Sequence, residues 1–148
     1  MSKRRSSQSG FTLIELLIVV AVIGIVAAIS VIQYMGALDK AKQRATMADM
    51  RSISRALEAY LVDNHIVPND AGGVAMLSTI LIPYQINVVP QNDHWGHTYS
   101  FESNAFDAYT LESFGKDGAP GADITYNTRM DFALDIVIRD GHFVAAPE

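Results

Sequence analysis

One apolar segment near the N-terminus constrains this chain most. Phe11–Ile32 reads FTLIELLIVVAVIGIVAAISVI and contains a single charged residue. It is long enough to cross a hydrocarbon core of about 30 Å as a helix, which takes roughly 20 residues. Three cations precede it, Lys3, Arg4 and Arg5, and positively charged flanks stay cytoplasmic. We therefore expect a single-pass membrane protein with a cytoplasmic N-terminus and the rest of the chain on the other side.

An ordinary cleaved secretory signal does not account for this segment. Such a signal has a shorter apolar region, followed by a cleavage site made of small residues. Here no clean site of that kind separates the apolar run from the polar sequence that follows. The segment is therefore expected to stay attached to the domain behind it.

The one charge in the segment is the carboxylate of Glu15. A carboxylate inside an apolar span costs on the order of 2.5–3.5 kcal/mol on insertion scales, and such residues usually have a partner. Two readings are open. Glu15 is either a protonated or snorkelling residue near a helix end, or it pairs with a cation from a neighbouring subunit.

Composition excludes several classes of protein. The chain of 148 residues allows one ordinary domain beside the apolar segment. It contains no cysteine, which excludes disulfides, thiolate metal sites and a cysteine nucleophile. Its net charge of -5 argues against nucleic acid, which needs a basic face.

The junction between the basic start and the apolar segment resembles a known processing site. Gly10-Phe11-Thr12-Leu13-Ile14-Glu15 is similar to the GFTLIE motif of type IV pilins and type II secretion pseudopilins. The resemblance implies that residues 1–10 are a leader, which a prepilin peptidase removes by cutting between Gly10 and Phe11. It also implies N-methylation of the new Phe11 amine, and pairing of Glu15 with the Phe11 amine of an adjacent subunit.

A helical pattern continues beyond the apolar segment. No proline interrupts the chain before Pro68, so residues 33–66 are expected to extend the helix as an amphipathic stretch with one buried face. Many relatives of the resembled family carry a proline where this chain has Ile32, and this chain keeps their glycine as Gly24. The expected buried residues are Leu38, Ala41, Ala45, Ala48, Met50, Ile53, Leu57, Tyr60 and Leu61.

Residues 67–148 have the pattern of a small α+β domain. Val67–Gly73 is a loop, and a short helix is expected over Val74–Leu81. Apolar alternation or short apolar runs predict strands at Thr98–Phe101, Ala108–Phe114 and Ile136–Ile138, with a tight turn at Asp140-Gly141. The expected fold class is α+β: a long N-terminal helix, its first half transmembrane, packed on a small antiparallel sheet.

Two segments of this domain narrow the resemblance to the major pseudopilins of type II secretion. Asp93–Gly96 followed by Tyr99 is similar to their D-x-W-G-x-x-Y segment, and Ser113–Gly121 is similar to their S-x-G-x-D-G-x-x-G loop. The resemblance implies the pilin fold and a calcium ion in this loop. Calcium takes six to eight oxygen ligands, and the candidates are the carboxylates of Asp117 and Asp123 and the carbonyls of Leu111 and Phe114. A solvated glycine turn without an ion is the alternative.

Few other residues suggest chemistry. His94 and His97 are three residues apart, but a zinc site needs further ligands and a regular element to orient them. No motif for nucleophilic catalysis or phosphate binding is present in the sequence. The chain is therefore not expected to be an enzyme.

The expected function is that of a filament subunit of a type II secretion system, polymerising through the N-terminal helix. The expected partners are other copies of the chain, the prepilin peptidase, the inner-membrane assembly platform, minor pilins or pseudopilins, and the membrane. The domain would be periplasmic, or extracellular in a surface pilus. Two alternatives are a surface type IV pilin for adhesion or motility, and a calcium-binding membrane anchor that does not polymerise.

Overall fold

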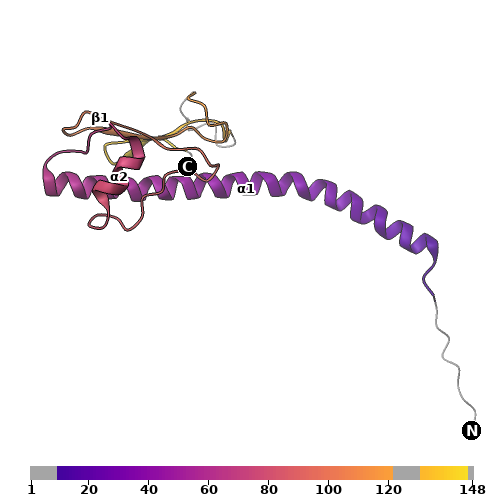
Figure 1. The fold of residues 1–148 in the computed structure, drawn as a ribbon. Helices are drawn as coiled ribbons and strands as arrows, with labels where there is room; N and C mark the ends of the chain where they lie inside the picture. The colour runs from indigo at the N-terminus through magenta and orange to yellow at the C-terminus, as the bar shows by residue number, and fades with distance from the viewer. Residues whose placement is uncertain (1–9, 122–130, 147–148) are drawn as a thin grey trace, which may run out of the picture. The chain divides into compact units, whose positions relative to one another are not determined.

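The computed structural model describes residues 10–121 and 131–146 (Figure 1). The chain divides at Leu38 into two units, an N-terminal helical unit and an α+β unit from Asp39 onward. The elements are α1 (Leu13–Asn64), α2 (Gly73–Leu81), β1 (Ser100–Ser103), β2 (Tyr109–Ser113), β3 (Ile136–Arg139) and β4 (His142–Ala145).

Helix α1 passes through both units without a break. Gly24 and Ile32 lie inside it, so this subunit shows no unwinding at the family's usual glycine or proline position. The helix stops where His65 adopts a left-handed φ of 60°, which turns the chain out of the helix. The observed end at Asn64 lies within two residues of the expected boundary at 66.

Only part of the predicted buried face of α1 is correct. Met50, Ile53 and Leu57 are fully buried, as expected. Leu38, Ala41 and Ala48 are exposed instead. The polar residues of the buried face explain the error, since two of its positions belong to Gln43 and Thr46, which a hydrophobic pattern cannot select.

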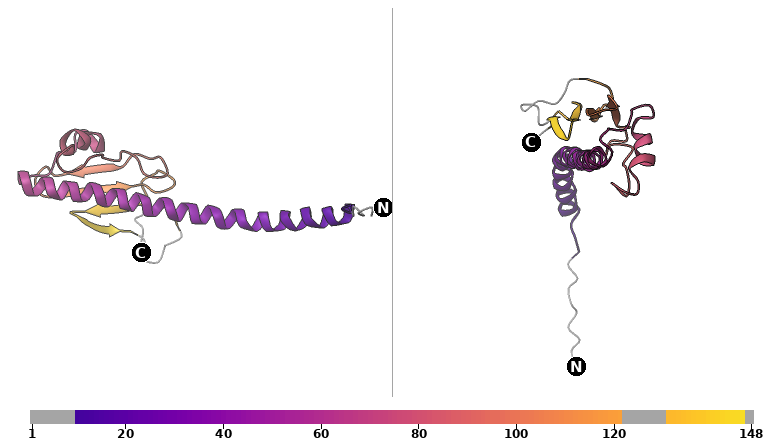
Figure 2. Two further views of the ribbon diagram at one scale, coloured as in Figure 1. Left: turned by 90° about the horizontal axis from the view of Figure 1, so that it is seen from below. Right: turned by 90° about the vertical axis from the view of Figure 1, so that its left-hand side faces the viewer.

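The sheet is an antiparallel meander in the order β1-β2-β3-β4. In the α+β unit its strands lie alongside α1, with α2 nearby, as Figure 2 shows. The predicted strands at 108–114 and 136–138 are confirmed by β2 and β3. The first strand starts later than expected, at Ser100, because Thr98 forms only an isolated bridge with Asn92. The predicted turn at Asp140-Gly141 joins β3 to β4.

The core lies between α1 and the inner face of the sheet. Tyr109 of β2 shows how the two layers are joined: its hydroxyl donates to Glu58 Oε1 on α1 at 2.9 Å and lies 2.9 Å from Ser54 Oγ. Burial raises the pKa of the Tyr109 hydroxyl, which stays protonated and acts as a donor. The expected helix over 74–81 is confirmed by α2, which buries Val74, Leu77 and Leu81.

Candidate functional site

The predicted processing site lies at the start of α1. Among the described residues nothing lies within 4 Å of a Cβ added at Gly10, and Phe11 is 81% exposed. Both residues precede the first helical residue, Leu13. The predicted cleavage site therefore lies in an exposed, non-helical segment directly before α1.

Glu15 has a local partner that the sequence reasoning missed. Its Oε2 accepts hydrogen bonds from the backbone N–H of Thr12 at 2.9 Å and from the Thr12 hydroxyl at 2.8 Å. The Thr12 Oγ1 in turn accepts from the backbone N–H of Glu15 at 3.3 Å. This reciprocal pattern is a capping box, and the spacing T-x-x-E before an apolar run was the signal for it.

The capping box leaves part of the Glu15 carboxylate available. Within the described residues, no hydrogen bond is made by the second oxygen, Oε1. Glu15 therefore has two separable properties, a hydrogen-bonding role at the helix start and a negative charge for which the described residues supply no cation. The first explains local helix formation, whereas the second still requires a partner.

The N-terminal unit presents an uncovered apolar surface. Its apolar segment has a mean hydropathy of 2.9 over 18 residues, with none of that window buried, and is long enough to cross a membrane. Large side chains such as Leu13, Ile32 and Tyr34 are all more than two thirds exposed. Such a surface is stable only in lipid or against other apolar helices.

In the α+β unit, the carboxylate of Asp93 organises the turn around Trp95. Its Oδ1 accepts three backbone N–H bonds, from Trp95, Gly96 and His97, at 2.8–2.9 Å. Its Oδ2 accepts from the hydroxyl of Ser113 at 2.9 Å. Because the side chain is almost fully buried, these bonds satisfy a charge that would otherwise be costly. Asp93 thus links the D-x-W-G turn to the end of β2.

The same turn is attached to α1 through Asp39. Its Oδ2 accepts from Lys116 Nζ at 2.7 Å, and its Oδ1 accepts from the Trp95 indole N–H at 3.4 Å. The Lys116 ammonium lowers the pKa of the Asp39 carboxyl, with a smaller contribution from Trp95. Asp39 is the first residue of the α+β unit, so this contact holds α1 where it enters the domain.

The loop after β2 is closely packed against its neighbours. Gly115 and Gly118 have φ values of 64° and 66°, and an added Cβ would lie 2.7 Å from the Phe132 carbonyl and 2.6 Å from the His97 ring, respectively. Only glycine fits at both positions. The glycines of the S-x-G-x-D-G pattern are therefore explained by packing, independently of any ion.

The predicted calcium ligands lie in different environments. Asp117 is exposed, and its Oδ1 accepts from the backbone N–H of Ala119 at 3.3 Å. Phe114 follows directly after β2, whereas Leu111 is buried at its centre, opposite both Phe101 and Ile138. A carbonyl at the centre of a sheet normally bonds to a neighbouring strand. Asp123 lies outside the described residues.

A further carboxylate at this loop was not foreseen. Asp135 is buried, and its Oδ2 accepts from the backbone N–H of Gly121 at 2.8 Å. It comes from the segment just before β3. Among the described residues no group of three His, Cys, Asp or Glu side chains has the geometry of a metal site. The oxygen-rich loop nevertheless has donor chemistry suited to calcium, because carboxylate and carbonyl oxygens are the ligands of that ion.

The two histidines of the turn have different partners. His94 Nε2 lies 3.1 Å from Asp49 Oδ2 on α1, and its backbone N–H donates to Thr46 Oγ1 at 3.1 Å. His97 Nδ1 lies 2.9 Å from the carbonyl of Gly115. Each ring therefore connects the turn to a separate element.

Comparison with known proteins identifies the group to which these features belong. The family model for type II secretion system protein G matches residues 33–128, which is most of the chain. The chain belongs to the type II secretion system protein G family. A second model, the prokaryotic N-terminal methylation motif, matches residues 5–31. The two matches meet in α1, so the processing segment and the α+β unit are parts of one pseudopilin.

Curated relatives span almost the same length. The type II secretion system core protein G of Klebsiella michiganensis is 33% identical over 130 residues, covering 81% of this chain and 92% of the relative. That of Pseudomonas aeruginosa is 34% identical over 136 residues, covering 81% and 94%. That of Vibrio cholerae is 30% identical over 148 residues, covering 88% and 99%. The expected role, a major pseudopilin of type II secretion, is therefore confirmed in preference to a surface pilin.

Proposed function

We propose that the mature chain polymerises into a periplasmic pseudopilus through the apolar part of α1. The observation that carries this proposal is the uncovered apolar surface of the N-terminal unit, with one carboxylate that no cation among the described residues neutralises. In a helical filament, other copies of the chain would cover this surface. The protein acts in this way as a structural subunit.

Processing comes first in the proposed assembly. A prepilin peptidase cuts the exposed bond between Gly10 and Phe11, and the new amine of Phe11 is methylated. Cleavage removes the cations Lys3, Arg4 and Arg5 and creates one ammonium group at the membrane boundary. Before the cut, the chain is held in the inner membrane with its N-terminus in the cytoplasm.

Glu15 then selects the axial position of each subunit. Its Oε2 caps the helix, and its charge pairs with the Phe11 ammonium of an adjacent copy. A carboxylate and an ammonium in apolar surroundings each need the other, because a lone buried charge is strongly unfavourable. A subunit in the wrong axial position would leave both charges unpaired, so the pair favours one register.

We also propose that calcium binds to the loop between β2 and β3. Asp117, Asp123 and the carbonyl of Phe114 would supply oxygens, and the ion would hold the loop to the sheet. The donor set supports the proposal because calcium prefers carboxylate and carbonyl ligands in a flexible arrangement. The location of Leu111 inside β2 makes it a less suitable donor than the residues of the loop.

The experiment that tests assembly separates the charge of Glu15 from its capping role. Glu15→Gln keeps an acceptor oxygen for Thr12 but removes the charge, whereas Thr12→Ala removes the capping hydroxyl and keeps the charge. With the secretion platform and peptidase present, we expect Glu15→Gln to insert in the membrane but form no filaments. Thr12→Ala should still assemble, with a helix start weakened by about 1 kcal/mol. Normal filaments from Glu15→Gln would refute the pairing.

A further inference from the structure

The outer face of α1 carries a row of cations in the α+β unit. Lys40, Arg44, Arg51 and Arg55 are all exposed. Their spacing of four, seven and four residues puts them on one side of the helix, away from its buried face. We call these four residues the basic stripe. Ala41 and Ala48 are also exposed and small, so another surface can approach this side closely.

The basic stripe is not neutralised within the subunit. Among the described residues, the ion pairs are His94–Asp49, His97–Asp93 and Lys116–Asp39, and none of them includes the stripe. Arg51 alone has a specific contact, since its guanidinium lies 5.1 Å from the centre of the Phe143 ring. Cation–π stacking preserves the positive charge. The stripe therefore presents a net positive face on a chain that is acidic overall.

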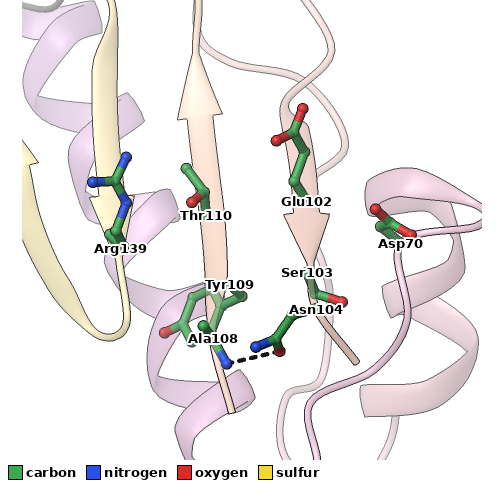
Figure 3. A pocket seen from close by; sticks show the side chains of 8 residues that line it. All are labelled: Asp70, Glu102, Ser103, Asn104, Ala108, Tyr109, Thr110 and Arg139. Carbon is green, nitrogen blue, oxygen red and sulfur yellow. Dashed lines mark hydrogen bonds between the residues drawn. The ribbon is translucent and has the colours of Figure 1, made fainter. Parts of the chain in front are cut away.

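Carboxylates without cations lie on another part of the unit. A hollow of about 350 Å³ is lined by Asp70 and Glu102, among other residues (Figure 3). Asp107 lies close by, at the β1–β2 turn, where its Oδ1 accepts from Asn104, another lining residue, at 2.9 Å. We call Asp70, Glu102 and Asp107 the acidic rim. All three are exposed, and none is in an ion pair with a described residue.

The basic stripe and the acidic rim lie at opposite edges of the sheet. Phe101 of β1 is buried toward the core, so its neighbour Glu102 points to the outer face of the sheet. The stripe lies away from the buried residues of α1, and Arg51 stacks on Phe143 of β4, the sheet edge opposite to the β1 strand of Glu102. The two charged surfaces therefore cannot neutralise each other inside one subunit, but a second copy can bring them together.

We propose that the basic stripe of one subunit docks on the acidic rim of a second copy of this chain. The inference rests on the proposed filament function and names a contact between its globular units. Two different patches that pair between copies form a heterologous contact, which generates an open helical filament when its rotation does not close into a ring. Complementary charges fix the orientation and register of such a contact. A single salt bridge would not neutralise the stripe, because the stripe contains four cations.

One lining residue limits where the stripe can dock. Arg139 borders the hollow from β3, two strands away from Glu102, with Thr110 paired to both. Adjacent strands lie about 4.8 Å apart, which separates the two side chains by roughly 10 Å. Incoming cations are therefore attracted to the side of Asp70 and Glu102 and repelled from the side of Arg139.

Exchange of the two charges tests this contact in the full-length protein. Arg44→Glu and Glu102→Lys are each expected to lower the yield of sheared filaments about tenfold, because each places like charges opposite each other. The double variant Arg44→Glu/Glu102→Lys should restore most of the yield. Asp131→Lys, at an exposed carboxylate outside both surfaces, should assemble like the wild type. Membrane levels and folding of each variant are checked by immunoblot and circular dichroism.

The outcomes separate this inference from the proposed function. Wild-type protein that forms no filaments overturns the proposed function and this contact with it. Wild-type filaments that both single variants also form overturn the contact alone. A basic helix face also binds anionic lipid headgroups. The stripe would be assigned to lipid if Arg44→Glu lowered the filament yield while Glu102→Lys did not, and the double variant did not recover it. That result would contradict docking between copies.

Discussion

At the scale of single residues, Asp93 shows why the D-x-W-G turn needs an aspartate. A buried carboxylate here accepts three backbone N–H bonds of the turn and one hydroxyl from the end of β2. A glutamate would place its oxygens one methylene further out, and an alanine would remove this acceptor from all three N–H groups. Asp93 therefore stabilises the turn. The fluorescence of Trp95, the single tryptophan of the chain, reports on the folding of this region.

Removal of this carboxylate should destabilise the domain strongly. We expect Asp93→Ala to lower the free energy of unfolding by about 3 kcal/mol, since three backbone N–H groups and the buried Ser113 hydroxyl lose their acceptor. Asp93→Asn should cost less, because its amide oxygen can still accept from the three N–H groups. Denaturant unfolding of the full chain in detergent, followed by Trp95 fluorescence, measures both. Glu102→Ala, at an exposed carboxylate, is the matched control. If Asp93→Ala unfolded at the same denaturant midpoint as this control, the stabilising role of Asp93 would be contradicted.

Glu15 combines two roles in one side chain. Its charge predicts a partner in another subunit, and the T-x-x-E spacing independently predicts a capping box with Thr12. The two readings of Glu15 are compatible, because capping engages one oxygen and leaves the charge. The distinction matters for mutants: alanine at position 15 removes both roles, whereas glutamine removes only the charge.

At the scale of elements, two kinds of contact hold α1 in the α+β unit: polar contacts at the start of that unit and apolar packing further along the helix. Asp39 contacts Lys116 and Trp95 where the helix enters, and Met50, Ile53 and Leu57 fill the core beyond. The stability of α1 around Asp39 should therefore depend on the charge of this carboxylate. The apolar part should not respond to pH.

The contact between Asp39 and Lys116 should therefore give a pH-dependent stability. The pKa of Asp39 is lowered in the folded state, mainly by Lys116. Its contribution is fully present above the ordinary carboxyl pKa of about 4 and is lost as the pH falls through the lowered folded-state value. Because Lys116 is half exposed, we expect the difference in unfolding free energy between wild type and Asp39→Asn to be about 1 kcal/mol or less at pH 7. That difference should vanish in strong acid.

A pH series of denaturant unfolding curves measures this difference. Lys116→Met should reproduce the effect of Asp39→Asn, since either change removes the pair. A stability gap between wild type and Asp39→Asn that stays constant down to pH 2 would contradict the assigned role of the Asp39 charge.

The elements also show how far sequence reasoning reaches. Apolar alternation located β2, a short apolar run located β3, and loop chemistry located the turn before β4, because these features depend on local pattern. The entry half of the buried face of α1 was wrong, because Gln43 and Thr46 are buried there. Thr46 bonds to His94, which is distant in sequence. Contacts such as Asp39–Lys116 depend on tertiary structure, and no local pattern predicts them.

At the scale of the whole molecule, the two units have different requirements. The α+β unit has its own core, whereas the N-terminal unit has none and depends on lipid or on other copies. The proposed filament meets the requirements of both units, because it would cover the apolar helices and leave the α+β units in water. The family match across residues 33–128 and the methylation motif at 5–31 correspond to these two parts.

Calcium, if it binds the proposed loop, should stabilise the domain as a whole. At a free concentration of about 100 times Kd, a ligand that binds only the folded state adds roughly 2.7 kcal/mol. Full-length protein in detergent should then melt several degrees lower in EGTA than in calcium. Asp117→Asn and Asp123→Asn should abolish this difference, and Asp131→Asn should keep it. Equal melting temperatures of the wild type in EGTA and calcium would favour the ion-free glycine turn.

The whole account depends on the creation of one ammonium group at Phe11. Mass spectrometry of the chain purified from membranes of cells that contain a prepilin peptidase identifies its first residue directly. The account predicts an N-terminal peptide that begins at Phe11 and carries a methyl group on its amine. An intact N-terminus at Met1, or a cut elsewhere in the leader or after the apolar segment, would contradict it.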